Sequence, residues 1–324
     1  RRGARGAPAL SALPPRYGEA IERIVARAGD GIQGEVEGLS AAYRGGSPAR
    51  AARTPAAVAA YLAYRAPATY AACAFAFRHL AARRPEWRPQ TLLDAGAGPG
   101  VATWAALEQW PSLEELTLVE AEPAMAAAGR ELLPEGRWAE SDVGAARGPA
   151  DLVLASYVLG ELDDPARAAA GLWAEAADTL VVVEPGTPAG YRRVLDARDA
   201  VLAAGGHTVA PCPHDLPCPL PPGDWCHFAA RLPRSRLHRR AKGAEMGWED
   251  EKLSYVALSR EPVRPASSRI IRPPRLRSGH VRLVTSDRDG AVRERTVSRR
   301  EGATYRAARK AAWGDALEIV ADSN

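Results

Sequence analysis

The sequence predicts a doubly wound α/β fold, in which helices cover both faces of a largely parallel sheet. Runs of apolar residues with the length of strands alternate with helical patterns, which is typical of repeated strand–helix–strand units. The first run leads directly into a glycine-rich turn, and a helical stripe that includes Val101 and Trp104 follows at once. The four strand candidates are residues 91–94, 116–120, 151–156 and 180–184.

The glycine-rich turn carries glycines at alternate positions, Gly96, Gly98 and Gly100. Such spacing lets the backbone bend tightly and approach a ligand, and the free amides of the following helix start offer hydrogen-bond donors. Val101 stands where the dinucleotide fingerprint Gly-x-Gly-x-x-Gly requires its last glycine. The turn therefore predicts a nucleotide-like ligand and argues against NAD.

Three acids follow three successive strand-like stretches in a meaningful order. Asp94, two residues before the first glycine, resembles the acid of motif I in S-adenosylmethionine-dependent methyltransferases, which helps to position the methionine part of the cofactor. By the same resemblance Glu120 takes the ribose hydroxyls, Asp142 partners the adenine amino group, and Met125 packs on adenine. We therefore predict a class I S-adenosylmethionine-dependent methyltransferase (Rossmann-like) core that binds the cofactor through Asp94, Gly96, Gly98, Gly100, Glu120 and Asp142.

Residues 151–156 occupy the position of the fourth strand in methyltransferases, and the end of that strand is where these enzymes usually keep residues that face the substrate. Ser156, Tyr157 and Glu161 are the catalytic candidates at this place. The polar residue, two prolines and aromatic residue of amino-methylating enzymes are missing here, and so is a nucleophilic Pro-Cys pair. Packing and capping roles fit the three residues as well as a pocket does.

The chain divides into three predicted regions. Residues 1–88 read as a mostly helical N-terminal region, residues 89–262 as the methyltransferase-like core with a Cys-rich loop at 211–228, and residues 263–324 as a small basic extension that contains β-structure. Within the extension a proline-broken linker over 262–274 precedes a hairpin with strands at 281–285 and 291–297, and a short basic helix ends the chain.

Charge is distributed unevenly along the chain. The net charge of +4 combines +8 over residues 1–90, −14 over 91–230 and +10 over 231–324. Two basic arms around an acidic cofactor-binding middle suit contact with an RNA backbone, while a plain solvated surface is the alternative. The predicted RNA-docking surface comprises Arg293, Arg295, Arg299, Arg300, Arg306, Arg309 and Lys310, with Tyr305 and Trp313 nearby.

The sequence predicts a protein without a membrane association. No apolar run approaches the roughly 18 residues of a membrane span, and no hydrophobic signal core opens the chain. Residues 1–18 carry four arginines before the first acid, as a mitochondrial transit peptide would, but the whole chain is rich in arginine. We therefore expect a cytoplasmic bacterial protein, monomeric away from its partner, and favour the mitochondrial matrix less.

Three of the four cysteines, Cys212, Cys218 and Cys226, fall within 15 residues of a proline-rich loop. Thiolates are soft metal ligands, and prolines order a loop in advance, so clustered cysteines without a secretory signal indicate a metal or an iron–sulfur cluster before disulfides. Intervals of five and seven residues match neither paired zinc motifs nor ferredoxin runs. Two other interpretations are unliganded thiols and a zinc site completed by His214 or His227. We expect the fourth cysteine, Cys73, to be a packed core side chain.

Several longer strings make a resemblance specific. The chain resembles the family of methyltransferase-like proteins associated with the mitochondrial small ribosomal subunit, together with its bacterial relatives, over nearly its whole length. The resemblance implies an rRNA methyltransferase fold, a role in small-subunit assembly and, in many members, a four-iron cluster on four cysteines. The strings that carry it are residues 157–162, 183–188, 211–214, 225–228, 249–255, 305–310 and 313–315.

One departure from the family pattern concerns the fourth cysteine, which the family places in a C-terminal strand after a Gly-His-Val-like stretch. Here that stretch is 279–281, and Ser286 or a neighbour stands at the cysteine position. A cluster on Cys212, Cys218 and Cys226 with an external, His or Asp ligand, a zinc site, and a lost cluster are the alternatives.

The predicted function follows from these features together. We expect a protein associated with the small ribosomal subunit that binds its rRNA during assembly or translation and transfers a methyl group from S-adenosylmethionine if it is active. The alternative is a non-catalytic iron–sulfur assembly factor on a methyltransferase fold.

Overall fold

The computed structural model describes residues 13–29, 32, 34–36, 38, 53–145, 148–242 and 246–318. Within these residues no helix has the length and apolar character that crossing a bilayer requires. Most of the arginine-containing start of the chain, residues 1–12, lies outside the described residues.

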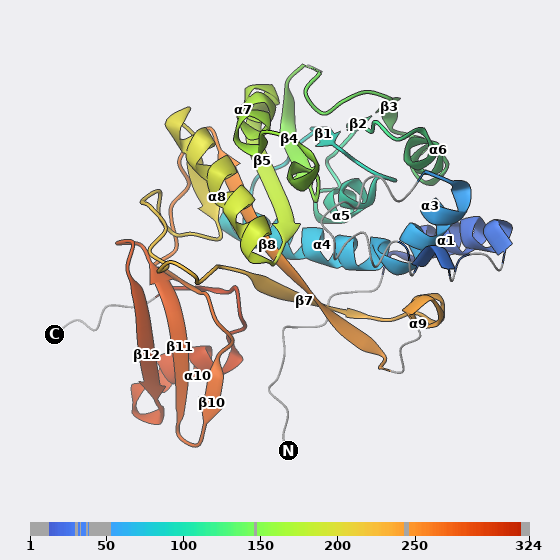
Figure 1. Cartoon of the computed structure of the whole chain (residues 1–324). Helices are drawn as coiled ribbons and strands as arrows, with labels where there is room; N and C mark the ends of the chain where they lie inside the picture. The colour runs from blue at the N-terminus through green and yellow to red at the C-terminus, as the bar shows by residue number, and fades with distance from the viewer. Residues whose placement is uncertain are drawn as a thin grey trace.

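An eight-stranded sheet forms the core, in the order β3-β2-β1-β4-β5-β8-β6, with β7 pairing on β8 (Figure 1). Neighbouring strands are parallel from β3 to β5, whereas β8 runs antiparallel to β5, β6 and β7. The predicted doubly wound α/β architecture is confirmed. The strands are β1 (Thr91–Ala95), β2 (Glu115–Val119), β3 (Arg137–Ala139), β4 (Ala150–Ser156), β5 (Ala176–Pro185), β6 (His207–Ala210), β7 (Phe228–Pro233) and β8 (Trp248–Ser259).

Apolar residues alternate between the two faces of the sheet, as strand geometry requires. Leu92 and Leu154 belong to the larger hydrophobic cluster, which also takes in α4 (Ala66–Arg83) and α5 (Val101–Gln109). Their neighbours Leu93 and Val153 belong to the second cluster, with α7 (Pro165–Glu175) and α8 (Pro188–Ala203). Both faces are therefore covered, which explains why strands β1, β4 and β5 are apolar almost throughout.

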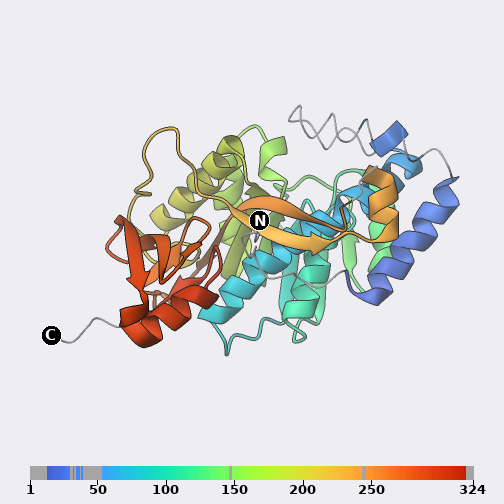
Figure 2. The same ribbon diagram turned by 90° about the horizontal axis from the view of Figure 1, so that it is seen from below.

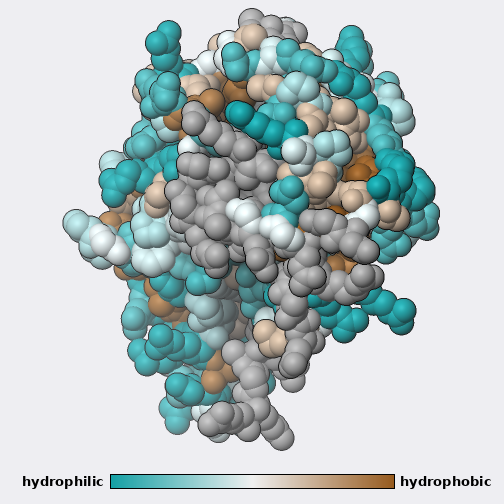
Figure 3. Space-filling view, turned by 45° about the vertical axis from the view of Figure 1, so that its right-hand side comes forward, coloured by the Kyte–Doolittle hydropathy of each residue, from teal (hydrophilic) through white to brown (hydrophobic). Residues whose placement is uncertain are grey.

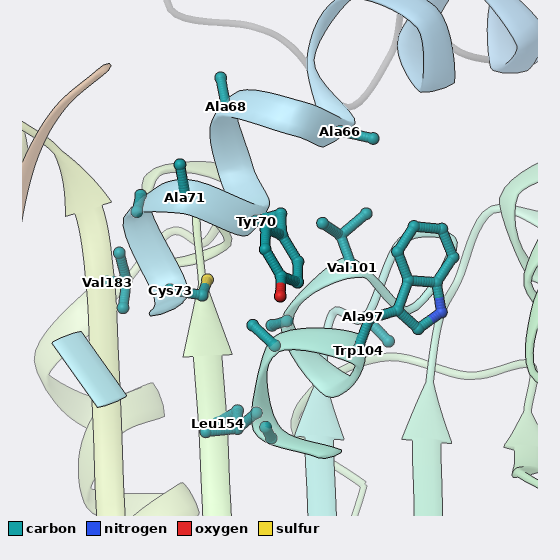
Figure 4. Close-up of a cluster of buried hydrophobic side chains, with 14 of the residues drawn as sticks. Ala66, Ala68, Tyr70, Ala71, Cys73, Ala97, Val101, Trp104, Leu154 and Val183 are labelled. Carbon is teal, nitrogen blue, oxygen red and sulfur yellow. The ribbon is translucent and has the colours of Figure 1, made fainter. Parts of the chain in front are cut away.

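The N-terminal region is helical as predicted, with α1 (Pro15–Ala28) and α3 (Pro55–Tyr64) preceding α4. Pro67 lies in the first turn of α4, and the break between α3 and α4 falls at Arg65. Tyr17 of α1 stacks on Trp104 of α5 with ring centroids 4.4 Å apart. Figure 4 shows α4 passing over the start of α5, with Tyr70 and Cys73 pointing toward the strand ends.

A two-stranded arm made by β7 and β8 reaches away from the sheet. Seen from below, it crosses α4 and carries α9 (Arg236–Lys242) to the side of the N-terminal helices (Figure 2). The guanidinium of Arg231 lies 3.8 Å from the ring centroid of Trp248 on this arm. The arm therefore ties the last strands of the core to the first helices of the chain.

A second, five-stranded sheet follows, in the order β10-β11-β9-β13 with β12 pairing on β11. The predicted hairpin is confirmed as β11 (His280–Asp287) and β12 (Val292–Ser298), and the predicted final helix as α10 (Gly302–Lys310). The linker prediction over 262–274 is wrong in part, because β9 (Ser268–Ile270) lies within it and pairs with β11. The remaining elements are α6 (Pro123–Leu132), η3 (Leu159–Glu161), η4 (Arg299–Glu301), β10 (Arg275–Arg277) and β13 (Ala316–Leu317).

Hydrophilic residues predominate on the face that Figure 3 shows, and hydrophobic residues appear there in small groups. The second sheet nevertheless has its own small core, because Val281, Leu283 and Val297 pack against Tyr305 and Ala308 of α10. Aliphatic side chains at period two in β11 meet the apolar stripe of the helix, which carries Tyr305.

Candidate functional site

The carboxyl ends of β1 and β4 lie side by side where the chain order of the sheet reverses, which is where ligands bind in open α/β sheets. The three glycines of the turn after β1 all have positive φ. A Cβ at Gly96 would lie 2.4 Å from Val158 Cγ2, and one at Gly100 would lie 2.5 Å from Leu133 Cδ1, whereas Gly98 faces space that is open to 4 Å. The first and last glycines are thus packing requirements, and the middle one borders room for a ligand.

Asp94 is fully buried at the end of β1. Thr103 Oγ1 donates a 2.7 Å hydrogen bond to Asp94 Oδ2, while Asp94 Oδ1 is buried without a partner in the described structure. Burial raises the pKa of this carboxyl to about 6. A buried carboxylate oxygen without a donor is costly, so it calls for a donor from a bound group.

Glu120 follows β2 and accepts a hydrogen bond from the glycine-rich turn. Its Oε2 accepts a 2.8 Å hydrogen bond from the amide of Gly98, and its Oε1 accepts one of 2.7 Å from the amide of Glu122. Asp142 lies in the loop after β3, and Met125 is buried on the inner side of α6. The structure thus brings Asp94, the glycines and Glu120 together; the cofactor roles assigned to them, and to Asp142 and Met125, stay predictions.

Tyr157 directly follows β4 and has a φ of +58°, the one positive value among the described residues other than glycine. Its hydroxyl donates a 3.2 Å hydrogen bond to Glu251 Oε1. Arg65 holds both oxygens of the same carboxylate, at 2.9 and 3.3 Å. Burial and the nearby Glu251 carboxylate raise the pKa of Tyr157 well above its usual value.

Sequence reasoning missed Arg65 and Glu251, because they come from the α3–α4 junction and from β8, far from Tyr157 in the chain. The acidic run at 249–251 was a visible signal, but nothing in the sequence connected it to β4. Tyr157 therefore belongs to a polar cluster in which its hydroxyl and the Arg65 guanidinium both contact the Glu251 carboxylate.

The other two catalytic candidates occupy different surroundings. Ser156 is half-buried at the last position of β4, and Glu161 is exposed on η3. A residue the sequence did not single out for a role, Glu184, is 1% exposed and accepts hydrogen bonds from the amide of Leu159 and from Arg193 Nε. Glu184 therefore fixes the loop after β4 from the neighbouring strand.

Cys212, Cys218 and Cys226 line one cavity together with Tyr191 and Ser286. The Tyr191 hydroxyl lies 2.9 Å from Cys218 Sγ. Burial raises the pKa of Cys212 to about 11, and burial together with the neighbouring thiols raises that of Cys226 further. As placed, no three His, Cys, Asp or Glu side chains of the described residues form a group that could hold a metal ion. The cavity is therefore not a preformed single-ion site.

Two buried arginines flank the thiols. Arg269 Nε donates to the Pro211 carbonyl at 2.8 Å, and its Nη1 contacts His79 Nδ1 at 3.1 Å and the Gly314 carbonyl. Arg198 donates to the carbonyls of His214 and Leu216. Both arginines are 2% exposed, and within the described part of the chain no carboxylate pairs with Arg269. Arg198 pairs with Asp199 Oδ1 at 2.9 Å. Both guanidinium charges act to lower the pKa of Cys212, but burial outweighs them and the pKa stays raised.

The remaining cysteine and the histidines have separate surroundings. Cys73 is buried in α4 near Asp94 and does not line the cavity, in agreement with the prediction that it is a packed core residue. The ring of His227 stacks on Trp225 and packs edge-on against Trp313. His214 Nε2 lies 3.4 Å from Ser286 Oγ.

The predicted RNA-docking surface needs correction. Tyr305 is 6% exposed and belongs to the core of the second sheet, so its ring is not presented for stacking, and Trp313 is partly buried against the main core. Arg293 and Arg295 are held by Asp287, and Arg293 also by Asp289. The hairpin brings Asp287 and Asp289 next to these arginines across the turn, so carboxylates partly compensate their charge.

Comparison with known proteins decides the family. The family model described as "Mitochondrial small ribosomal subunit Rsm22" matches residues 55–318. The chain belongs to the Rsm22 family. A human relative, the mitochondrial ribosome assembly protein METTL17, is 33% identical over 295 residues, with 81% of this chain and 63% of the relative covered. The Rsm22-cox11 tandem protein 2 of Schizosaccharomyces pombe is 28% identical, with 72% and 39% covered.

The chain thus spans 63% of the human relative and 39% of the fission yeast relative. Solved structures that it resembles include magnesium protoporphyrin IX methyltransferase from Synechocystis with bound cofactor, at a TM-score of 0.36 and 13% identity, covering 57% of this chain and 76% of that one. The plantazolicin methyltransferase BpumL gives a TM-score of 0.41 and 12% identity, with 75% and 98% covered. The predicted family is confirmed, and the sheet order itself confirms the predicted doubly wound α/β fold.

The predicted cytoplasmic location is wrong. The matching family model describes a mitochondrial ribosomal component, and the human and fission yeast relatives are mitochondrial proteins. The sequence argument failed because general arginine richness was used to discount the acid-free N-terminal segment, whereas family membership is the stronger indication.

Proposed function

We propose that this Rsm22-family protein binds small-subunit rRNA during ribosome assembly, with S-adenosylmethionine as a bound ligand of its core rather than as the source of a transferred methyl group. The observation that carries the proposal is the contrast between the two sides of the β1–β4 switch point. Asp94 Oδ1 has no donor in the described structure on the cofactor side, whereas on the other side Arg65 and the Tyr157 hydroxyl already engage the Glu251 carboxylate.

The cofactor side fits S-adenosylmethionine through its chemistry. The open space beside Gly98 admits a ligand, and the lone acceptor of Asp94 suits an ammonium or amide donor. Glu120 keeps lone pairs that hydroxyl groups can use, although each of its oxygens already accepts one backbone amide. When bound, the cofactor would bring its cationic sulfonium next to the carboxylates of Asp94 and Glu120.

Among the residues that the structure describes on the acceptor side, the carboxylates of Glu251 and Glu184 are already engaged. A base must reach the proton it removes and must not be committed elsewhere. Glu251 is held by both Arg65 nitrogens and by the Tyr157 hydroxyl, and Glu184 is held by Arg193. Methyl transfer to rRNA remains the competing function, and the crosslinking experiment below separates the two.

We propose an iron–sulfur cluster in the thiol cavity, as a clamp between the core and the second sheet; the support for it is that three cysteines line one cavity. Cys212, Cys218 and Cys226 would hold it, and Arg198 and Arg269 supply positive charge beside them. A cluster would add covalent links between loops that hydrogen bonds now hold, and metal ligation couples directly to local folding. Zinc on the same thiols is the alternative, and it would require the loops to move, because the described side chains do not already form a group that could hold one ion.

RNA contact is assigned to exposed cations at one end of the second sheet and on its helix. Arg277 lies beside His280, which pairs with Ser298, and Arg299 and Arg300 follow Ser298 directly. Arg306 and Lys310 are exposed on α10, four residues apart. We call Arg277, Arg299, Arg300, Arg306 and Lys310 the C-terminal basic surface; within the described structure none of the five is seen to pair with a carboxylate.

The test is crosslinking of the full chain to cellular RNA, with mapping of rRNA methylation in cells that have or lack the protein. We expect crosslinks on small-subunit rRNA and an unchanged set of methyl groups. A methyl group that disappears near the crosslink would establish the enzyme instead. Failure to co-sediment with small-subunit particles at low salt, where phosphate contacts are strongest, would reject both functions.

A further inference from the structure

The arm formed by β7 and β8 has two faces of different character. Glu251 on one face pairs with Arg65, so that face is turned toward the body of the protein. Side chains alternate along a strand, so Trp248, Asp250 and Lys252 share the opposite, outer face, and all three are exposed. The outer face thus presents a tryptophan to solvent, a side chain that is mostly buried in folded proteins.

Arg231 fixes the position of this exposed ring. Its guanidinium lies 3.8 Å from the ring centroid of Trp248 and forms a bidentate pair with Asp250, at 2.7 and 2.8 Å. The cation covers one face of the indole, yet the residue stays 41% exposed. A planar ring that is held in place and open to solvent can stack on another planar group, and every nucleobase has such a face.

Cations without a carboxylate partner lie near the ring. Trp248 pairs with Pro233 across the two strands, and α9 begins three residues after Pro233. Arg236 and Arg239 are exposed on one side of α9, and Lys252 lies on the outer face of the arm. Within the part of the chain that the structure describes, none of these three cations forms an ion pair.

Resting on the rRNA binding proposed above, we propose that the outer face of the arm binds single-stranded RNA, with one base stacked on Trp248. Arg236, Arg239 and Lys252 bind phosphates on either side of that base. Charge complementarity favours RNA over an apolar protein segment, because the unpaired groups around the ring are cations. Bases within a duplex are already stacked on one another, so this surface selects unpaired segments.

This contact is separate from the C-terminal basic surface. Figures 1 and 2 place α9 and α10 at opposite ends of the molecule. The two surfaces can therefore be changed independently, and an RNA that reaches both is held at two places.

The experiment measures binding of the full chain to fluorescein-labelled oligouridylate, and to its duplex with oligoadenylate, by fluorescence anisotropy. Trp248→Ala should weaken binding of the single strand about tenfold, because one base loses its stacking partner, and should leave duplex binding unchanged. Trp248→Phe keeps a ring and should retain most of the affinity. Leu216→Ala, which truncates another exposed apolar side chain, is the matched control and should bind as the parent does.

The phosphate contacts have a test of their own. Arg236→Gln combined with Arg239→Gln should lower the slope of log affinity against log salt by about 1.4, since each phosphate contact on a single strand contributes about 0.7. Trp248→Ala should leave that slope unchanged, because stacking releases no counterion. An unchanged slope in the double variant would remove α9 from the RNA contact.

Two results overturn the inference as a whole. One is equal affinity of the parent and Trp248→Ala for the single strand. The other is a Trp248→Ala variant that binds RNA normally but sediments poorly with small-subunit particles, because the ring would then contact a protein. A parent that fails to co-sediment with the particles would instead reject the proposed function, whatever its affinity for oligouridylate. Circular dichroism shows whether each variant has folded.

Discussion

The amide of Gly98 donates a 2.8 Å hydrogen bond to Glu120 Oε2, so the middle glycine of the turn is held by the carboxylate that ends the neighbouring strand. This contact aligns the turn with the second strand while leaving the space beside Gly98 open. It joins two parts of the predicted cofactor site before any ligand is present.

Gly98→Arg should abolish S-adenosylmethionine binding, because the new side chain would occupy the open space and would also be strained at a φ of +55°. Isothermal titration calorimetry of the parent should show binding heat that the variant lacks. Gly171→Arg on α7 is the matched control, since a Cβ there also meets nothing within 4 Å. Equal affinity in parent and Gly98→Arg would remove the turn from the site.

Asp94→Asn should stabilise the free protein above pH 6. The pKa of Asp94 is raised to about 6 in the folded chain, so the folded state binds its proton more tightly than the unfolded state does. Stability is therefore lost as pH rises from about 4 through 6, by roughly 3 kcal/mol in all. Urea unfolding should show a gain for the variant at pH 7.5 that vanishes at pH 4.

The same carboxylate should make cofactor binding depend on pH. A cationic donor favours ionised Asp94, so affinity for S-adenosylmethionine should fall as pH drops below about 6. Asp94→Asn should bind weakly at every pH between 5 and 8. A parent affinity that stays constant over this range would show that Asp94 does not contact the ligand.

Glu251→Gln should destabilise the chain by about 3–5 kcal/mol, because it leaves the largely buried Arg65 guanidinium without its counter-charge. The double variant Arg65→Met, Glu251→Gln should recover part of that loss. Urea unfolding of the two single variants and the double variant measures the coupling. Strictly additive losses would mean that the pair does not hold the loop after β4.

Trp104→Ala should cost about 3–5 kcal/mol, because the indole is fully buried and stacks on Tyr17. The loss should also release α1, since Tyr17 packs on this ring. Unfolding in urea and proteolysis near the N-terminus are the measurements. Trp248→Ala, at a residue 41% exposed, should change stability far less.

Arg306→Glu combined with Lys310→Glu should weaken binding to small-subunit particles at least tenfold at low salt, because two phosphate contacts become repulsive. Sedimentation of particles with labelled protein measures the loss. Arg137→Glu on β3 is the control, since that arginine is exposed and already pairs with Glu115. Equal binding of both proteins would move the RNA contact away from α10.

The sequence by itself determined the alternation of strands and helices, the glycine turn and the C-terminal hairpin. Those features are local: Leu92 and Leu93 are next to each other and point to opposite faces, and the Asp-x-Gly-x-Gly-x-Gly string is continuous. Short β3 is not among the four strand candidates, because three residues give too little pattern to place the bounds of a strand.

Only the tertiary structure decided which distant residues meet. Arg65 and Glu251 are 186 positions apart and come together only because the β7–β8 arm crosses α4. Arginine–aspartate pairing across the β11–β12 turn likewise changed which cations stay exposed. Electrostatic pairing and burial depend on distances through space, and sequence patterns report only neighbours along the chain. The family motif located Ser286 only along the chain, and the tertiary structure shows that it lines the same cavity as the three thiols.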